Sequence, residues 1–106
     1  MSAKELQTVD SSELCDAYHH EPLPAIKAEI VRRNIVPENE WSQIDKEEIA
    51  VGMSELGLVC AWGKPISVKE SIAQLGDDKQ WEYHSCPRCD ISYVYTRNGK
   101  VTSLQH

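Results

Sequence analysis

Apolar residues recur at intervals of three and four along the first half of the chain, a spacing that predicts helices. Asp10 is a typical helix cap, and Pro24 suits the first position of a second helix, where a missing N–H costs nothing. Asn34 is expected to end that second helix in a left-handed conformation, and Pro37 begins a shorter helical segment. The first helical part is therefore expected to occupy residues 10–44.

A third helix is expected in the middle of the chain, followed by a change of pattern. Ser54 can cap this helix, which runs to about Trp62. Gly63 and Pro65 then supply the usual stop signal. From Gln80 onward apolar and polar residues alternate, which is typical of β-strands. The chain is therefore expected to change here from helices to a sheet.

Two hairpins are expected in the alternating part of the chain. The first joins residues 80–85 to residues 91–95. The second turns at Asn98 and Gly99, a strong turn signal, into residues 100–104. A loop of three or five residues in the first hairpin would gather its large side chains on one face, because a one-residue slip reverses every side chain. The residues expected on this buried face are Trp81, Tyr83, Ile91, Tyr93 and Tyr95.

The order of these elements predicts one domain of the α+β class. At 106 residues the chain has room for a single hydrophobic core. N-terminal helices are expected to pack on one face of a C-terminal antiparallel three-stranded meander. The helical part would span residues 10–44, and a further helix with the sheet would span residues 49–106.

The charge of the chain argues against nucleic acid as a partner. With 11 Lys and Arg residues against 17 Asp and Glu residues, the formal net charge is -6, whereas contacts to phosphates require a basic surface. A membrane protein is not expected either. The mean hydropathy is -0.48, and no apolar run approaches the roughly 18 residues that a spanning helix needs.

The N-terminus predicts the compartment and, with it, the state of the cysteines. Residues 1–9 lack the apolar run of a secretory signal, so a cytoplasmic location is expected. Thiols are kept reduced in that compartment. Structural disulfides among the four cysteines are therefore not expected.

Five short motifs follow one another in the second half of the chain. In order, they are Gly52-Met53-Ser54, Gly63-Lys64-Pro65, Trp81-Glu82-Tyr83, Tyr93-Val94-Tyr95 and Asn98-Gly99-Lys100-Val101. Over residues 49–104 they resemble the SmpA/OmlA/BamE family, whose wider fold group includes the β-lactamase-inhibitor-protein domain. The resemblance implies a helix-plus-sheet fold that binds other proteins without catalysis. Cys15 lacks the apolar segment that precedes the lipid-modified cysteine of the family's lipoproteins, so outer-membrane assembly is not implied.

Cys86-Pro87-Arg88-Cys89 is the sharpest local motif for chemistry. Two thiolates at a hairpin tip can bind one tetrahedral zinc ion, which needs two further ligands. Cys15 and His19 lie four residues apart on the first expected helix and could complete the set. The further candidates are Cys60, His20 and His84. The alternative is a reduced thiol pair at an exposed turn, with Cys15 and Cys60 as small buried apolar residues.

Sequence motifs for catalysis are missing from the chain. It contains no Gly-rich phosphate loop, no nucleophile elbow and no His-Glu-x-x-His sequence. Neighbouring acidic residues occur in polar stretches and are better explained as solvated loops. An enzyme, or a bound cofactor other than zinc, is therefore not expected.

The chain is thus expected to be a small protein-binding module, an inhibitor or an adaptor, whose partner the sequence does not name. If the large aromatic residues face the helices, the reverse side of the sheet is free to receive another protein. The contact residues expected on that side are Glu82, His84, Ser92 and Val94. The competing hypothesis is a zinc-stabilised structural domain that uses Cys86 and Cys89 with Cys15 and His19.

Overall fold

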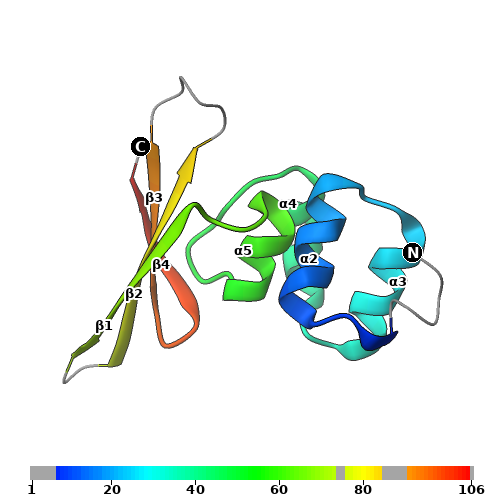
Figure 1. Ribbon diagram of the computed structural model, residues 1–106, viewed down its shortest axis with the longest axis horizontal. Helices are drawn as coiled ribbons and strands as arrows, with labels where there is room; N and C mark the ends of the chain where they lie inside the picture. The colour runs from blue at the N-terminus through cyan, green and yellow to red at the C-terminus, as the bar shows by residue number, and fades with distance from the viewer. Residues whose placement is uncertain (1–6, 74–75, 85–90, 106) are drawn as a thin grey trace.

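The computed structural model describes residues 7–73, 76–84 and 91–105. Helices lie on one side of the molecule and an antiparallel sheet on the other (Figure 1). The helical elements are α2 (Ser11–His20), α3 (Pro24–Arg33), the 3-10 helix η1 (Glu38–Glu40), α4 (Trp41–Asp45) and α5 (Glu55–Trp62). The strands are β1 (Ser67–Ala73), β2 (Gly76–His84), β3 (Ile91–Arg97) and β4 (Lys100–Gln105). The expected α+β class is confirmed.

The helix boundaries agree with the local signals in the sequence. The Asp10 carboxylate accepts a hydrogen bond of 3.1 Å from the Ser12 amide and so caps α2. Pro24 is the first residue of α3, and Asn34 follows its last residue with a φ of 53°. Gly63 follows α5 with a φ of 81°. Each signal acts because it satisfies backbone groups, or allows a backbone conformation, at a helix end.

A buried carboxylate also fixes the start of α5. The Ser54 hydroxyl accepts a hydrogen bond of 3.0 Å from the Gly57 amide, as expected for a helix cap. Glu40, only 5% exposed, accepts bonds from the Ser54 amide over 3.1 Å and from the Ser54 hydroxyl over 2.9 Å. A Cβ atom on Gly57 would overlap the Glu40 carboxylate. The glycine inside this helix is therefore explained by the close approach of Glu40.

The sheet is a meander of four strands in the order β1-β2-β3-β4, so the expected three-stranded meander was one strand short. The additional strand, β1, pairs with β2 along its whole length. It contains Lys69 and Glu70 and no clear alternation of apolar residues, which hid it in the sequence. Charged side chains are typical of edge strands, which must not pair with other chains.

The pairing of β2 with β3 differs from the expected register. Trp81 pairs with Val94 and Tyr83 pairs with Ser92. An even number of residues, 85–90, connects the two strands, and these lie outside the described residues. The expected loop of three or five residues is therefore wrong, and with it the expected sorting of side chains between the two faces.

The observed register divides the aromatic residues between the two faces of the sheet. Trp81 and Tyr83 point toward the helices, whereas Tyr93 and Tyr95 lie on the opposite face. The buried residues of the helix-facing side are Trp81, Tyr83, Val94, Thr96 and Val101. The half-buried residues of the opposite side include Gln80, Glu82, Ile91, Tyr93 and Tyr95. Of the aromatic residues of the sheet, only Trp81 and Tyr83 thus belong to the core; Tyr93 and Tyr95 do not.

The helix-facing side of the sheet packs on α5 through a chain of polar contacts. The Trp81 indole donates to the Thr96 hydroxyl over 3.0 Å, and this hydroxyl donates to the Glu55 carboxylate over 2.7 Å. Lys79 reaches the same carboxylate over 3.3 Å. The first residue of α5 is thereby attached to both β2 and β3.

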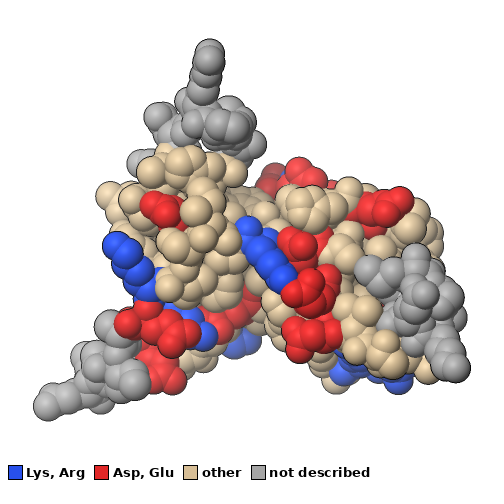
Figure 2. Space-filling model, viewed as in Figure 1, with Lys and Arg blue, Asp and Glu red and all other residues tan. Residues whose placement is uncertain are grey.

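Charged side chains are mixed over the surface. On the face in Figure 2, basic and acidic groups lie next to one another, including at the junction between the helices and the sheet. Within the described residues, no helix is both long and apolar enough to cross a membrane.

Cys15 of α2 and Cys60 of α5 form a disulfide. Both residues are buried, at 0% and 2% exposure. This corrects the expectation that structural disulfides are disfavoured. Packing of α2 against α5 brings together two thiols that are 45 residues apart in sequence, and no local pattern indicates such an approach.

An ion cluster within α3 gives the fold a defined dependence on pH. Glu29 is 7% exposed and accepts hydrogen bonds from Arg32 over 2.9 Å and from Arg33 over 2.8 Å. These bonds, led by those from Arg32, lower the pKa of Glu29 from 4.5 to about 2. Because the folded-state pKa is depressed, the stabilisation is present above pH 4.5 and is lost as the pH falls toward 2.

Replacement of Glu29 by Gln is therefore expected to reduce the loss of unfolding free energy that accompanies acidification. The measurement is the free energy of unfolding by urea, taken between pH 4.5 and pH 2.5 for both proteins. Wild type is expected to lose more stability than E29Q across this interval. Equal losses would show that Glu29 makes no such contribution.

Candidate functional site

A cleft of about 700 Å³ lies where the helices meet the sheet. Its volume is in the range of sites that hold a small molecule or a short peptide segment. It is lined by His19, His20, Glu47, Trp62, Gly63, Lys64, Ile66, Tyr83, His84 and Ser92. The helical part and strands β2 and β3 thus both contribute walls, and the turn between α5 and β1 joins them.

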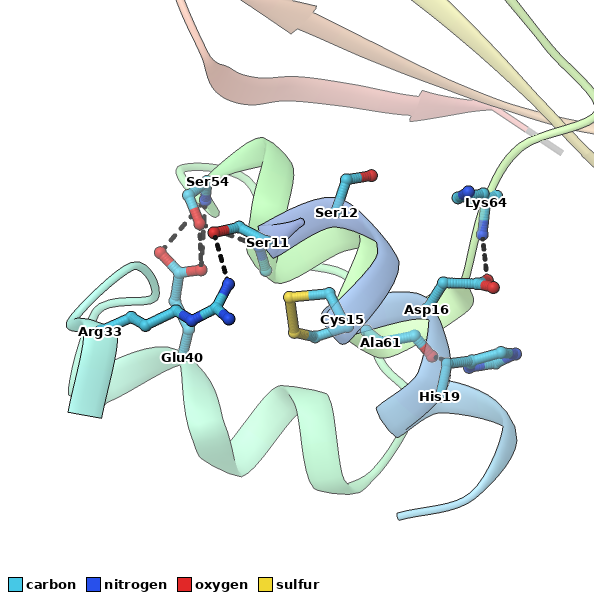
Figure 3. The surroundings of a disulfide bond; sticks show 12 residues. Ser11, Ser12, Cys15, Asp16, His19, Arg33, Glu40, Ser54, Ala61 and Lys64 are labelled. Atoms are coloured by element: carbon cyan, nitrogen blue, oxygen red, sulfur yellow. Dashed lines mark hydrogen bonds between the residues drawn. A yellow bond between two sulfur atoms is a disulfide. The ribbon is translucent and has the colours of Figure 1, made fainter. Parts of the chain in front are cut away.

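The turn after α5 is held against α2 by several contacts. A Cβ atom on Gly63 would lie 2.8 Å from the His19 ring, so glycine is needed for this close approach as well as for the φ of 81°. The Lys64 amide donates to Asp16 over 3.0 Å, and the Lys64 amine forms an ion pair with Glu13. Figure 3 shows Lys64 and Asp16 facing each other beside His19. The turn is therefore a fixed part of the cleft.

Two aromatic rings form one wall of the cleft. Trp62 and Tyr83 contact each other edge to face, with ring centroids 5.4 Å apart. The Trp62 indole donates to the Glu47 carbonyl over 2.8 Å, and the Tyr83 hydroxyl donates to the Gly63 carbonyl over 2.9 Å. Tyr83 is only 6% exposed and supports the wall from behind, whereas the half-buried Trp62, whose indole N–H is already bonded within the protein, can offer mainly its π surface to a ligand.

His19 is fixed beside this wall. Its Nδ1 atom lies 2.8 Å from the Ala61 carbonyl oxygen. A carbonyl only accepts hydrogen bonds, so Nδ1 carries a proton. In the neutral ring, Nε2 is therefore the hydrogen-bond acceptor. The cleft thus contains an oriented imidazole whose second nitrogen can accept a bond from a ligand.

Negative charge surrounds the base of the cleft. A hydrogen bond from the Lys64 amine to Glu13 raises the pKa of Lys64, and the carboxylates of Glu13, Asp16 and Asp10 add to this effect. The pKa of Tyr83 is raised by burial and further by the charge of Asp16. The positive charge of Lys64 is thereby offset by nearby acids, and Glu47 adds a carboxylate to the cleft itself.

The structure separates the four contact residues that were expected on one face. His84 and Ser92 line the cleft. Glu82 lies on the face of the sheet turned away from the helices, where it accepts a hydrogen bond of 3.1 Å from Ser67. Val94 is 0% exposed and belongs to the core, so it has no surface for a partner. The expectation of one shared contact face is therefore wrong, because it rested on the wrong register.

The face of the sheet away from the helices is organised by Tyr95. Its hydroxyl accepts a hydrogen bond of 3.2 Å from Gln80 and donates one of 3.1 Å to Gln105. The carboxylate of Asp78 pairs with Arg97 at the end of the same face. These polar groups already have partners within the sheet, so this face offers a ligand fewer hydrogen-bonding groups than the cleft does.

The expected zinc set is not assembled as predicted. Cys86 and Cys89 lie outside the described residues. Cys15 is bonded to Cys60 and so offers no thiolate, and His19 uses one nitrogen on the Ala61 carbonyl. Within the described residues, no group of three or more His, Cys, Asp or Glu side chains is arranged to hold a metal ion. Cys15 of α2 therefore cannot serve as a ligand of a zinc ion that would join this helix to the hairpin.

Sequence reasoning missed most of the cleft. His19 and His20 were considered as metal ligands, His84 as a metal ligand or a contact residue on another surface, and Trp62, Gly63 and Lys64 as a helix end and part of a family motif. The available signal was the position of a tryptophan and a lysine on either side of the Gly63 turn. That signal becomes informative only once α2 is known to pack beside the turn.

Comparison with known proteins gives no indication of function, so a proposal about function depends on the cleft. No family model, curated protein or solved structure matches this chain.

Proposed function

We propose that this chain is a small, non-enzymatic protein-binding module that receives a segment of its partner in the cleft between the helices and the sheet. The observation that carries the proposal is the wall formed by Trp62 and Tyr83, whose polar atoms are bonded internally while their rings line the cleft. Aromatic rings held in this way supply contact area at low entropic cost and are enriched at protein interfaces.

The surroundings of the wall support the same function. The turn at Gly63 and Lys64 is held by contacts with Asp16, His19 and Tyr83. Partner binding therefore loses little conformational entropy in ordering this turn. Ile66, which lines the cleft, is 59% exposed. An exposed apolar side chain beside an aromatic wall is a typical feature of a contact surface. The resemblance to the SmpA/OmlA/BamE family agrees with an inhibitor or adaptor role.

A photo-crosslinking experiment tests whether the partner enters the cleft. The amino acid p-benzoylphenylalanine is placed at Ile66, and in a matched control at Val51, which is 73% exposed and does not line the cleft. In the cell that makes this protein, we expect the Ile66 variant to crosslink to one protein. We expect no such product from the Val51 variant.

Two outcomes would contradict the proposal. The first is crosslinking of the same protein with equal yield from both positions, which would indicate contact without a defined site. The second is a product from a variant with the crosslinker at Tyr93 and none from Ile66. That result would assign the contact to the opposite face of the sheet.

A further inference from the structure

We infer that the partner inserts a positively charged side chain, best fitted by arginine, against Trp62 in the cleft. This inference rests on the proposed function and specifies the chemistry of the partner. It follows from three features of the described residues: a half-buried tryptophan ring with no described Lys or Arg over it, acceptors beside that ring, and an excess of negative charge around it.

The first feature is a contrast between two tryptophans. The Lys27 amine lies 4.8 Å from the ring centroid of Trp41, held there by an ion pair of 3.0 Å with Asp45. Among the described residues, this is the only Lys or Arg placed over an aromatic ring. None of the described Lys or Arg residues therefore lies over the ring of Trp62. The protein thus uses a cation–π contact at Trp41, whereas the Trp62 ring lines the cleft in edge-to-face contact with Tyr83.

The second feature is the set of hydrogen-bond acceptors beside Trp62. The backbone of Glu47 is held in place, with a φ of 57° and its carbonyl bonded to the Trp62 indole. Its side chain is exposed and lines the cleft, and its carboxylate forms no ion pair within the described residues. The Nε2 atom of neutral His19 adds a second acceptor. A ligand that donates several hydrogen bonds satisfies both.

The third feature is the balance of charge. Among the described residues, Lys64 is the one Lys or Arg that lines the cleft, and its amine is bonded to Glu13 with Asp16 and Asp10 nearby. The whole chain carries a formal charge of -6. The negative charge therefore attracts a cation both at short range, near the ring, and at long range, whereas it would repel an acidic segment.

Arginine matches these features better than an apolar side chain or a lysine. Its guanidinium group is planar and stacks on an indole face. It also carries five N–H donors in a fixed arrangement, so it can stack on Trp62 and donate to Glu47 and His19 together. The lysine amine is a compact charge that stacks less well and orients its donors less precisely.

The test uses three short peptides that differ at one position. The probes are acetyl-Gly-Ser-X-Ser-Gly-amide with X as arginine, citrulline or glutamate, titrated into ¹⁵N-labelled protein and followed by NMR. Citrulline keeps the planar group but has no charge. We expect the arginine peptide to shift the Trp62 indole N–H resonance and to bind roughly 3- to 30-fold more tightly than the citrulline peptide. The glutamate peptide is expected to bind more weakly than either.

Matched variants separate the cleft from other aromatic surfaces. W62L is expected to abolish binding of the arginine peptide, and E47Q to weaken it. W41L is the control, because Trp41 does not line the cleft and its ring is already covered by Lys27. It should bind as wild type does. Raising the salt concentration from about 50 mM to 500 mM should weaken binding to wild type.

The inference is overturned if citrulline binds as tightly as arginine, or if W41L removes binding as fully as W62L does. It is also overturned if Ile66 crosslinks to a partner while none of the three peptides shifts Trp62; in that case the proposed function stands. If the Ile66 variant captures nothing, the proposed function fails whatever the peptides do.

Discussion

Reduction of the Cys15–Cys60 disulfide is expected to lower the free energy of unfolding by about 4 kcal/mol. The bond joins residues 45 positions apart, and closing a loop of that size removes much of the entropy of the unfolded chain. It also ties α2 to α5, the two helices that carry His19 and Trp62. Urea denaturation with and without a phosphine reductant measures the effect.

The control for this prediction is the double variant C15A/C60A. Its stability should be low and should not change with reductant, which separates this bond from any effect on Cys86 and Cys89. If wild type is equally stable with and without reductant, the disulfide does not stabilise the fold. Titration of free thiols under denaturing conditions then shows whether Cys15 and Cys60 are bonded at all.

Replacement of Val94 by Asp is expected to destabilise the protein by at least about 3 kcal/mol, because it places an unpaired carboxylate in the core. Val94 is 0% exposed on the side of the sheet that packs against α5. The matched change on the next residue, Tyr93→Asp, lies on the opposite face and should cost about 1 kcal/mol. Unfolding by urea, followed by tryptophan fluorescence, measures both.

The two variants distinguish the observed register from the one that the sequence suggested. With a loop of odd length, Tyr93 would be buried and Val94 exposed, so the order of the two effects would be reversed. A larger loss for Tyr93→Asp than for Val94→Asp would therefore contradict the structure.

Features that depend on a few neighbouring residues were predicted correctly. The caps at Asp10 and Ser54, the start of α3 at Pro24, the left-handed residue Asn34 and the end of α5 at Gly63 all appear as expected. Each is decided by backbone groups within one helical turn. The turn at Asn98 and Gly99 follows the same rule, since both have positive φ.

The register of the sheet could not be predicted in this way. The expectation assumed that all large aromatic residues are buried together. In the structure, Trp81 and Tyr83 already fill the side that faces α5, and the smaller Val94 and Ser92 lie opposite them. The Tyr95 hydroxyl instead finds partners on the other face. Side-chain volume against α5, a tertiary property, therefore decided which residues point inward.

The cleft and the disulfide are tertiary features for the same reason. His19 and Gly63 lie in contact although they are far apart in sequence, as do Cys15 and Cys60. His84 and Ser92 were expected to contact a partner, but on the wrong surface. The place of Ser92 follows from the observed register, which puts it opposite Tyr83 on the side that faces the helices, whereas His84 lines the cleft as the last residue of β2.

The central claim is that this pairing directs Tyr83 toward Trp62 and so builds the wall of the cleft. Cross-strand NOEs in the NMR spectrum of the isotope-labelled protein test it most directly. The structure predicts contacts between Trp81 and Val94 and between Tyr83 and Ser92. Contacts between Trp81 and Tyr95, or between Tyr83 and Tyr93, would show the alternative register and would remove the cleft as described.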